Sequence, residues 1–488
     1  MSGLGGSILP PSAVAEAVAS FRAEGKRVVH ARGVFDLLDR HEVARLRAAR
    51  DGADVLVVTV ASASPTLAPV LAAMLRAQVV SALPFVFAVA LEGDLPAHEI
   101  ANLIGANTVI EEPEGPAARE QTSQPSVLDA TGRIDLVYPK PSAFTPEAEA
   151  FLTDFRRRYT ANDVIAAIHT LRKLRVLVVG DCIIDEYHFV RPLGMPLKSA
   201  IIASQFLEAE AYAGGVLAVA NHVAGFCDEV HLATVLGTKD TREEFVRSHL
   251  RPNVQPTFFY RSDAPTTVKR RYLLRFLVQR LFEVAFFNDH PLPPALDADV
   301  ARYLEAVCSD YDLVIVSDFG HGMLSQKSID ALCARASFLA VNTQINSINF
   351  GYHVISKYGR VDYVCIDEPE MRLAMRDRLT PVDQLLAPLA ESVRAKMVTV
   401  TRGNQGSVTY RADGLRATIP IMSRQVIDTI GAGDAYLSAS APCARLGMSP
   451  ELVGFIGNAI GGLAVRIVGN KEPVGPDTLI PFIKTLME

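Results

Sequence analysis

Asp428-Thr-Ile-Gly-Ala-Gly-Asp434 is the stretch of this sequence that decides the fold and points most directly to chemistry. The small and apolar residues that follow it favour a helix. The backbone N–H groups of Gly431, Ala432 and Gly433 therefore lie at a predicted helix start, where such groups and the helix dipole can bind a phosphate. Asp434 lies in the same turn, and its carboxylate can accept the proton of an attacking hydroxyl. The stretch predicts a site for phosphoryl transfer.

A glycine-rich turn alone is weak evidence, since Gly-x-Gly also closes ordinary turns. Further segments, in a fixed order, point the same way. They are Arg175-Val-Leu-Val-Val-Gly-Asp-Cys-Ile-Ile-Asp185, Ala213-Gly-Gly215 with Asn221, Asp312-Leu-Val-Ile-Val-Ser-Asp-Phe-Gly-His-Gly322, Val398-Thr-Val-Thr-Arg-Gly-Asn-Gln-Gly406 and Asn458-Ala-Ile-Gly-Gly462. In this order they resemble the signatures of the ribokinase-like (PfkB) sugar kinases. The residues of these motifs are most similar to those of the kinase half of the bacterial bifunctional heptose-7-phosphate kinase/heptose-1-phosphate adenylyltransferase.

The resemblance implies a ribokinase-like α/β fold that uses ATP and Mg²⁺, and it implies roles for particular residues. Asp434 is the expected general base, and the turn at 431–433 is the expected anion hole. The residues expected to contact ATP are Thr401, Gly403, Gly406 and Asn458. Those expected to contact the sugar are Asp185, Gly214, Gly215 and Asn221. An ordinary turn or cap residue is the alternative role for Asp185.

The acids expected to organise Mg²⁺ depart from the family pattern. The family's Asn-x-x-Glu appears here as Asp367-Glu-Pro-Glu370. Glu370 and Asp367 can still organise the ion through water, since Mg²⁺ favours oxygen ligands and keeps several waters. Alternatively, Glu370 is only a solvated charge at a helix start.

The sugar side departs further from the heptose kinases. Ala218 stands where the family has an Asn, three residues beyond the Gly-Gly pair. His321 stands where the family has a Lys, and Lys198 stands where the heptose kinases have an acid. In the family these positions contact hydroxyls and a distal phosphate. We therefore expect a sugar or sugar phosphate as substrate, and expect heptose 7-phosphate to be a poor one.

The composition restricts the class of protein. At 488 residues, and about 100–200 residues per domain, the chain holds two to four units, and the motifs support two. A net charge of −6 without a long basic run argues against a nucleic-acid partner. Six cysteines lie far apart without a C-x-x-C pair, which favours reduced thiols and no structural zinc. We find no signal sequence or membrane span, so we expect a cytoplasmic protein without a membrane partner.

The N-terminal part alternates short apolar runs with amphipathic ones. The expected strands are Arg27–Ala31, Ala53–Val60 and Phe85–Val89, and the expected helices are Glu42–Ala49 and Ala68–Leu83. This alternation predicts a Rossmann-like parallel α/β sheet. Residues 113–146 are rich in Pro, Glu, Ser and Thr, which predicts an extended linker. We therefore expect one domain at residues 1–140 and a second at 141–488.

Gly33-Val-Phe-Asp36, followed by a helix and a buried strand, resembles the opening of the cytidylyltransferase-like nucleotidyltransferases. That family's His-x-Gly-His falls on Asp39-Arg-His-Glu42, so carboxylates replace both histidines. Like charges about 4 Å apart repel by roughly 1 kcal/mol in water and by about 4 kcal/mol at an effective dielectric near 20. We expect a catalytically inactive domain with a structural or regulatory role, placed before the kinase, the reverse of the bifunctional enzyme. His41 is the remaining candidate for catalysis, against an ordinary residue at a helix start.

Residues Ser199 to Tyr212 predict edge strands outside the main sheet. In the PfkB family such strands form a small lid that covers the sugar and pairs with a second subunit, so we expect a homodimer. An apolar edge left uncovered promotes aggregation, and pairing removes that risk. The alternative is an ordinary sheet edge covered by the N-terminal domain.

Together these patterns predict ATP-dependent phosphorylation of a sugar or sugar-phosphate hydroxyl by the C-terminal domain. Two other functions stay open. A non-catalytic sensor or scaffold would bind ATP without turnover. A bifunctional kinase and nucleotidyltransferase would release pyrophosphate.

Overall fold

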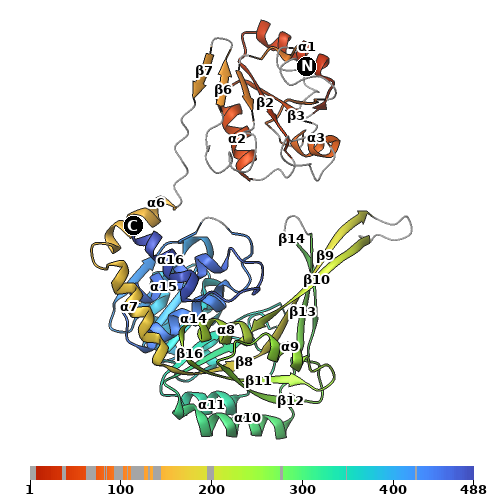
Figure 1. Ribbon diagram of the computed structural model, residues 1–488. Coiled ribbons are helices and arrows are strands. Elements are labelled where there is room, and N and C mark those ends of the chain that lie inside the picture. The colour runs from red at the N-terminus through yellow and green to blue at the C-terminus, as the bar shows by residue number, and fades with distance from the viewer. Residues whose placement is uncertain are drawn as a thin grey trace. The chain divides into compact units, whose positions relative to one another are not determined.

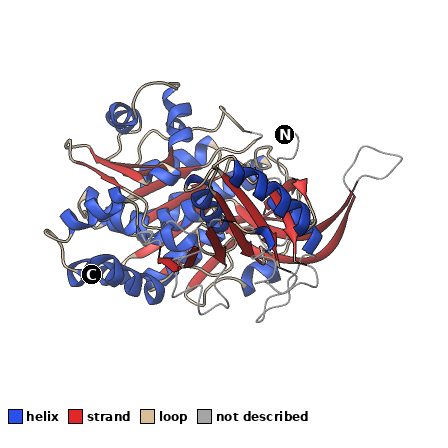
Figure 2. Ribbon diagram, turned by 90° about the horizontal axis from the view of Figure 1, so that it is seen from above, coloured by secondary structure: helices blue, strands red, loops and turns tan. Residues whose placement is uncertain are grey.

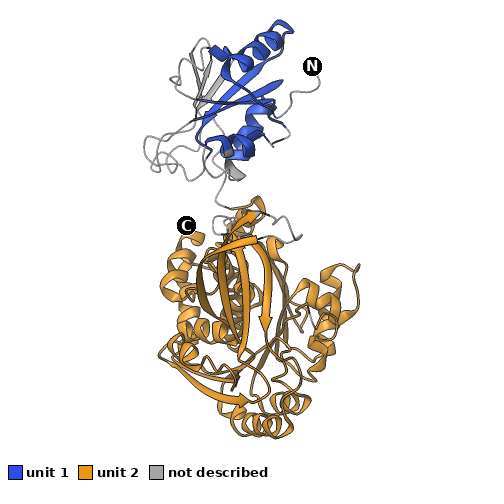
Figure 3. Ribbon diagram, turned by 90° about the vertical axis from the view of Figure 1, so that its right-hand side faces the viewer, with its two compact units in different colours: residues 1–142 blue, residues 143–488 orange. Residues whose placement is uncertain are grey.

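The structure is a computed structural model that describes residues 7–35, 40–61, 73–81, 83, 85–92, 103–106, 108–111, 126–129, 132–135, 144–194, 203–274, 279–347, 349–423 and 426–488. The chain divides into two compact units, residues 1–142 and 143–488 (Figure 3). None of the described helices is both long enough and apolar enough to cross a membrane. All six cysteines are unpaired, and five of them are buried.

The N-terminal unit is a sheet with helices on both faces. Its strands have the order β1-β4-β3-β2-β5-β6-β7, with β1 to β5 parallel and β6 and β7 antiparallel. The elements are β1 (Ser7–Ile8), α1 (Pro11–Ala23), β2 (Val28–Gly33), α2 (Arg40–Asp51), β3 (Val55–Val60), α3 (Ala73–Ser81), β4 (Ala88–Leu91), β5 (Thr108–Glu111), β6 (Ser126–Asp129) and β7 (Gly132–Asp135). Helices α2 and α3 pack with Leu56 and Val58 on one face, whereas α1 packs with Val55 and Val57 on the other. The predicted parallel α/β sheet is confirmed.

Two details of the prediction for this unit were wrong. The strand expected at Phe85–Val89 lies at Ala88–Leu91. The segment 113–146, expected to be an extended linker, contains the hairpin β6–β7 at the sheet edge, where Val127 lies opposite Ile134. Strand β6 pairs with β5 and β7 pairs with β6, so the hairpin extends the sheet by two antiparallel strands that the overall composition of the segment did not reveal.

The C-terminal unit is built around a second, larger sheet. Its strand order is β12-β11-β8-β15-β16-β17-β18-β19-β20, parallel from β12 to β18 and antiparallel from there on. The strands are β8 (Arg175–Gly180), β11 (Glu229–Gly237), β12 (Val254–Arg261), β15 (Leu313–Asp318), β16 (Leu339–Thr343), β17 (Tyr363–Asp367), β18 (Met397–Thr401), β19 (Ser407–Arg411) and β20 (Arg416–Ile419). The central strands β8 and β15 are continuous runs of Val, Leu and Ile because both of their faces are buried.

Helices cover both faces of this sheet (Figure 1). One face is covered by α6 (Pro146–Phe155), α7 (Ala161–Thr170), α8 (Val216–Phe226), α14 (Ala432–Arg445), α15 (Pro450–Ala464) and α16 (Pro476–Met487). The other is covered by α10 (Pro294–Val307), α11 (Gln326–Arg335), α12 (Glu368–Met375) and α13 (Val382–Ser392). The short helix α9 (Glu243–Ser248) connects β11 to β12. Thr145 caps α6, and Pro146 occupies its first position.

A separate sheet, the lid, projects from the C-terminal unit (Figures 1 and 2). Its order is β10-β9-β13-β14. The strands are β9 (Cys182–Gly194), β10 (Ala203–Gly215), β13 (Thr267–Leu274) and β14 (Gln279–Phe286). The prediction of edge strands outside the main sheet is confirmed, since β10 lies at one edge of the lid.

The lid starts where the central strands of the main sheet end. Strand β9 follows β8 after Asp181 alone, and β10 runs directly into α8. Strands β15, β17 and β18 end at Asp318, Asp367 and Thr401 on the same edge, because parallel strands share their carboxyl end. Open α/β sheets bind ligands at this edge, so the fold brings the predicted site residues toward one region.

Candidate functional site

The predicted anion hole lies at the start of a helix. Gly431 has a φ of 81° and caps α14. A Cβ at this position would lie 2.0 Å from Asn470 Oδ1, so the turn requires glycine. The N–H groups of a first helical turn have no partner within the helix. Gly433 is exposed, and a Cβ there would meet open space. A phosphate can therefore reach this helix end.

Asp434 lies in the first turn of α14, directly after these glycines. Burial raises the pKa of its carboxyl to about 7, and the nearby charge of Asp185 also raises it, whereas Lys269 lowers it. A base is most effective when its pKa lies near the working pH. The position and the pKa of Asp434 both suit a general base.

The lid places an acid and two basic residues beside Asp434. Asp185 on β9 is 4% exposed and forms an ion pair with Arg271 on β13. Lys269 lies opposite Asp185 in the parallel register of β9 and β13. Burial lowers the pKa of Lys269, although Asp185 acts in the opposite direction. The sequence analysis missed Lys269 and Arg271, for which the only signal was the basic run Lys269-Arg-Arg271.

The Gly-Gly pair is a close neighbour of Asp185. A Cβ on Gly214 would lie 2.1 Å from Asp185 Oδ2, so a larger residue would displace the carboxylate. Gly215 has a φ of 54° and caps α8. The structure thus brings together Asp185, Gly214 and Gly215, three of the four residues expected to contact the sugar.

Asn221, the fourth, is engaged elsewhere. Its Nδ2 donates to His249 O at 2.7 Å, and its Oδ1 accepts from Arg251 N at 2.9 Å. In the structure its amide therefore holds the loop between α9 and β12 against α8. Of the positions that depart from the heptose kinases, Ala218 is buried within α8 and Lys198 lies outside the described residues.

The expected nucleotide residues surround the turn between β18 and β19. Thr401 pairs with Ser407 across this hairpin, and Gly403 and Gly406 both have positive φ. Asn458, in the middle of α15, donates from Nδ2 to Ser407 Oγ at 2.6 Å. Through this hydrogen bond to Ser407 the Asn458 side chain stabilises the turn, which is a structural role, distinct from the nucleotide contact that we expected.

The two acids expected near Mg²⁺ form the N-terminal cap of α12. Asp367 Oδ1 accepts from Glu370 N at 2.7 Å, and Glu370 Oε2 accepts from Asp367 N at 2.9 Å. Burial raises the pKa of Glu370 to about 8, and the charges of Asp367 and Asp434 contribute. The described part of the chain shows no group of three or more His, Cys, Asp or Glu that would hold a metal directly. Each carboxyl has further lone pairs that can accept hydrogen bonds from water. The pair therefore suits a Mg²⁺ ion held through water, and not an ion bound directly by several side chains.

A buried carboxylate ties the anion-hole turn to the lid. Asp428 accepts hydrogen bonds from Tyr187 Oη at 2.7 Å, Ile430 N at 3.1 Å and Gly469 N at 2.9 Å, and it pairs with Arg280. Burial alone would raise the pKa of Asp428, but these hydrogen bonds and the charge of Arg280 lower it. Tyr187 and Arg280 belong to lid strands β9 and β14, so the lid and the turn are mechanically connected.

Comparison with known proteins agrees with this geometry. Residues 173–475 match the model of the pfkB family carbohydrate kinases. The bifunctional protein HldE of Shewanella baltica (strain OS185) is 27% identical over 311 residues, which cover 62% of this chain and 62% of that protein. The D-beta-D-heptose 7-phosphate kinase of Bordetella bronchiseptica is 29% identical over 306 residues, 61% of this chain and 93% of the kinase.

The solved structures show the fold. Phosphofructokinase-2 from Escherichia coli, in complex with potassium, superposes with a TM-score of 0.52 at 16% identity, covering 64% of this chain and all of that one. The family match spans more than half of the sequence, so the chain belongs to the pfkB family of carbohydrate kinases. The expected ribokinase-like fold is confirmed, and the expected enzyme class is confirmed at the level of the family.

Proposed function

We propose that this pfkB family kinase transfers the γ-phosphate of ATP to a hydroxyl of a sugar or sugar phosphate, with Asp434 as general base. The observation that carries the proposal is the position of Asp434, with its pKa raised to about 7, in the helix turn that begins at Gly431. An anion hole and a base within one turn are the two parts that phosphoryl transfer needs.

In this mechanism Asp185 and the Gly214–Gly215 turn hold the sugar so that one hydroxyl faces Asp434. Asp434 takes the hydroxyl proton while the new O–P bond forms and the bond to the ADP oxygen breaks. The N–H groups at 431–433 stabilise the charge on the transferred group. ATP would bind along the turn from Thr401 to Gly406. Asp367 and Glu370 would hold Mg²⁺ through water, and the ion would there neutralise phosphate charge.

Asp434 predicts a particular dependence of activity on pH. The base acts only when deprotonated, so kcat/KM should fall about tenfold per pH unit below its pKa of about 7. Lys269 lowers that pKa, so Lys269→Met should move the midpoint of the acid limb to higher pH. Lys269→Arg keeps the positive charge and should leave the midpoint near the wild-type value. A midpoint that is the same in all three proteins would contradict the assignment of the base.

The link between Asp428 and the lid predicts that Arg280 positions the anion hole. Arg280→Met leaves a buried carboxylate with one donor fewer, at a cost of about 1–3 kcal/mol. We expect kcat to fall about tenfold, with the melting temperature within a few degrees of wild type. Arg191→Met is the matched control, because Arg191 on β9 is exposed and donates across the lid to Gln205. Equal kcat values in the two variants would show that Arg280 has no positioning role.

We also propose that the lid pairs with a second copy of the chain. Support comes from the apolar side chains that remain exposed on its two edge strands: Phe206, Leu207, Leu281, Phe282, Val284 and Phe286. Covering such edges in a symmetric pair would remove apolar surface from water.

A further inference from the structure

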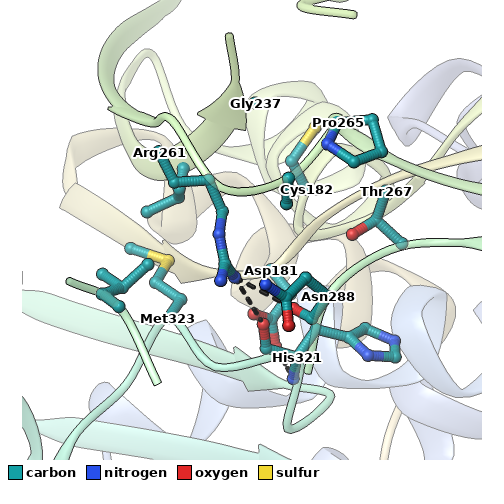
Figure 4. A pocket seen from close by; sticks show the side chains of 12 residues that line it. Asp181, Cys182, Gly237, Arg261, Pro265, Thr267, Asn288, His321 and Met323 are labelled. Carbon is teal, nitrogen blue, oxygen red and sulfur yellow. Dashed lines mark hydrogen bonds between the residues drawn. The ribbon is translucent and has the colours of Figure 1, made fainter. Parts of the chain in front are cut away.

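A polar cavity lies beside the proposed acceptor site, at the foot of the lid. The space in it that is open to a water-sized group measures about 20 Å³, and its lining includes Asp181, Arg261, Thr267, Asn288 and His321 (Figure 4). This is room for one group of the size of a water molecule or a hydroxyl, and it is too small for a phosphate. Thr267 of the lining lies on β13 two residues before Lys269, which pairs in register with Asp185. Lys269 Nζ lies 5.4 Å from the centre of the Phe319 ring, two residues before His321. The cavity therefore adjoins the residues proposed to hold the acceptor, and it can receive one hydroxyl of that acceptor.

His321 is the unexplained group of this cavity. Its side chain is 6% exposed, and neither ring nitrogen has a hydrogen-bond partner within the described part of the chain. Burial lowers the pKa of His321 to about 4, and Lys269 contributes, so the ring is neutral at physiological pH. A neutral imidazole has one donor and one acceptor nitrogen. A buried polar group without a hydrogen-bond partner destabilises the folded state, and a hydroxyl can satisfy either nitrogen.

The charges around the cavity do not suit a phosphate. Arg261 uses its five N–H groups within the protein: two donate to Asp263, and three to the carbonyls of Asn288, His290 and His321. Its charge is balanced by Asp263 at 2.8 Å. Asp181 brings a carboxyl into the lining, where it accepts from the backbone N–H groups of Phe319 and His321.

Lys269 is a second cation near the cavity, and the carboxyls around it outnumber it. The groups that act on it include Asp181, Asp185 and Glu283, against the like charge of Arg271. A dianionic phosphate in the cavity would approach Asp181, and the described residues that line the cavity offer it neither a free guanidinium nor a charged imidazole. A hydroxyl would meet an acceptor at Asp181 and a donor and an acceptor at His321.

We propose that this cavity binds a hydroxyl at the end of the acceptor remote from the transferred phosphate, and that this end is uncharged and not a phosphate ester. The inference rests on the proposed kinase function and narrows its substrate class from sugar or sugar phosphate to a neutral sugar. His321 is then a residue that determines specificity.

The test compares each neutral sugar with its phosphate ester. The pairs are ribose and ribose 5-phosphate, fructose and fructose 6-phosphate, and D-glycero-D-manno-heptose and its 7-phosphate, with ADP release as the readout. We expect kcat/KM of the best neutral sugar to exceed that of its ester at least tenfold. His321→Leu should raise the KM of this sugar about tenfold and leave the KM of ATP unchanged, whereas His321→Asn should recover part of the loss. His321→Lys should shift the preference toward the ester.

Direct binding separates a failure of this inference from a failure of the kinase proposal. If no pair supports ADP release, the kinase proposal fails, and calorimetric titration of the same sugars into the full-length wild-type and His321→Leu proteins decides the inference. Binding of a neutral sugar that weakens at least tenfold in His321→Leu would support it. Preference for the ester, an unchanged KM or affinity in His321→Leu, or no binding of any neutral sugar would overturn it. Melting temperatures check that each variant is folded.

Discussion

Asp434→Asn should abolish nearly all sugar phosphorylation while leaving the affinity for ATP intact. Loss of a general base costs about 10²–10⁴-fold in rate. Asparagine has the shape of the aspartate and keeps its position in the first turn of α14, but it cannot take the hydroxyl proton. The anion hole formed by the backbone N–H groups of residues 431–433 does not depend on this carboxylate. We therefore expect kcat to fall by at least 10², measured as ADP release with the best acceptor of a sugar panel.

Asp477→Asn is the matched control for this variant. Asp477 also lies in the first turn of a helix, α16, and its side chain is exposed. The same substitution there should leave kcat within about twofold of wild type, since surface changes of this kind are usually small. Wild-type turnover by Asp434→Asn would refute the role of the base. ATP binding by the wild type without turnover of any acceptor would favour the non-catalytic sensor or scaffold.

The parts of the site that could be predicted from sequence are those whose chemistry is local. The stretch from Asp428 to Asp434 contains the turn glycine, the helix start and the acid in consecutive positions, so its geometry follows from neighbouring residues. The strands β8 and β15 were equally visible, because strands buried on both faces are continuous apolar runs. The order of such segments was enough to predict the ribokinase-like fold.

The charges that adjust Asp434 could not be predicted in the same way. Lys269 and Arg271 lie on lid strand β13, and only the register of β13 against β9 places them beside Asp185. The pairing of Asp428 with Arg280 likewise joins residues far apart in sequence. The pKa of about 7 at Asp434 results from burial and from the charges of Asp185 and Lys269, so it arises only in the folded chain.

The side chains of Asn221 and Asn458 show a second limit of sequence reasoning. A motif places a residue on an element, but it does not say which way the side chain points. In the structure both amides form buried hydrogen bonds that support neighbouring turns. Their expected contacts with sugar and nucleotide stay predictions, and support of those turns is the role that their geometry favours.

The N-terminal unit should transfer no nucleotide. The helix α2 has Glu42 in its first turn, where a triphosphate would need the positive end of the helix dipole. Asp39, the other acid of the replaced motif, lies outside the described residues, as does the side chain of His41. At the ends of β2 and β3 the guanidinium of Arg76, 1% exposed, bonds to the carbonyls of Val34 and Ala61. That cation is therefore held by the protein and is not available to a phosphate.

We expect no pyrophosphate release from the full-length chain with any common NTP and any sugar 1-phosphate. The Asp434→Asn protein is the preferred background for this assay, because kinase turnover no longer consumes ATP while the N-terminal unit is unchanged. Removal of one transition-state donor costs about 10²–10³-fold, and here carboxylates replace two histidines and repel the triphosphate by roughly 1–4 kcal/mol at close range. Pyrophosphate release that disappears in His41→Ala would contradict this prediction and would favour a bifunctional enzyme. Release that persists in His41→Ala would point to a contaminating transferase, because no other histidine of the motif remains to perform the reaction.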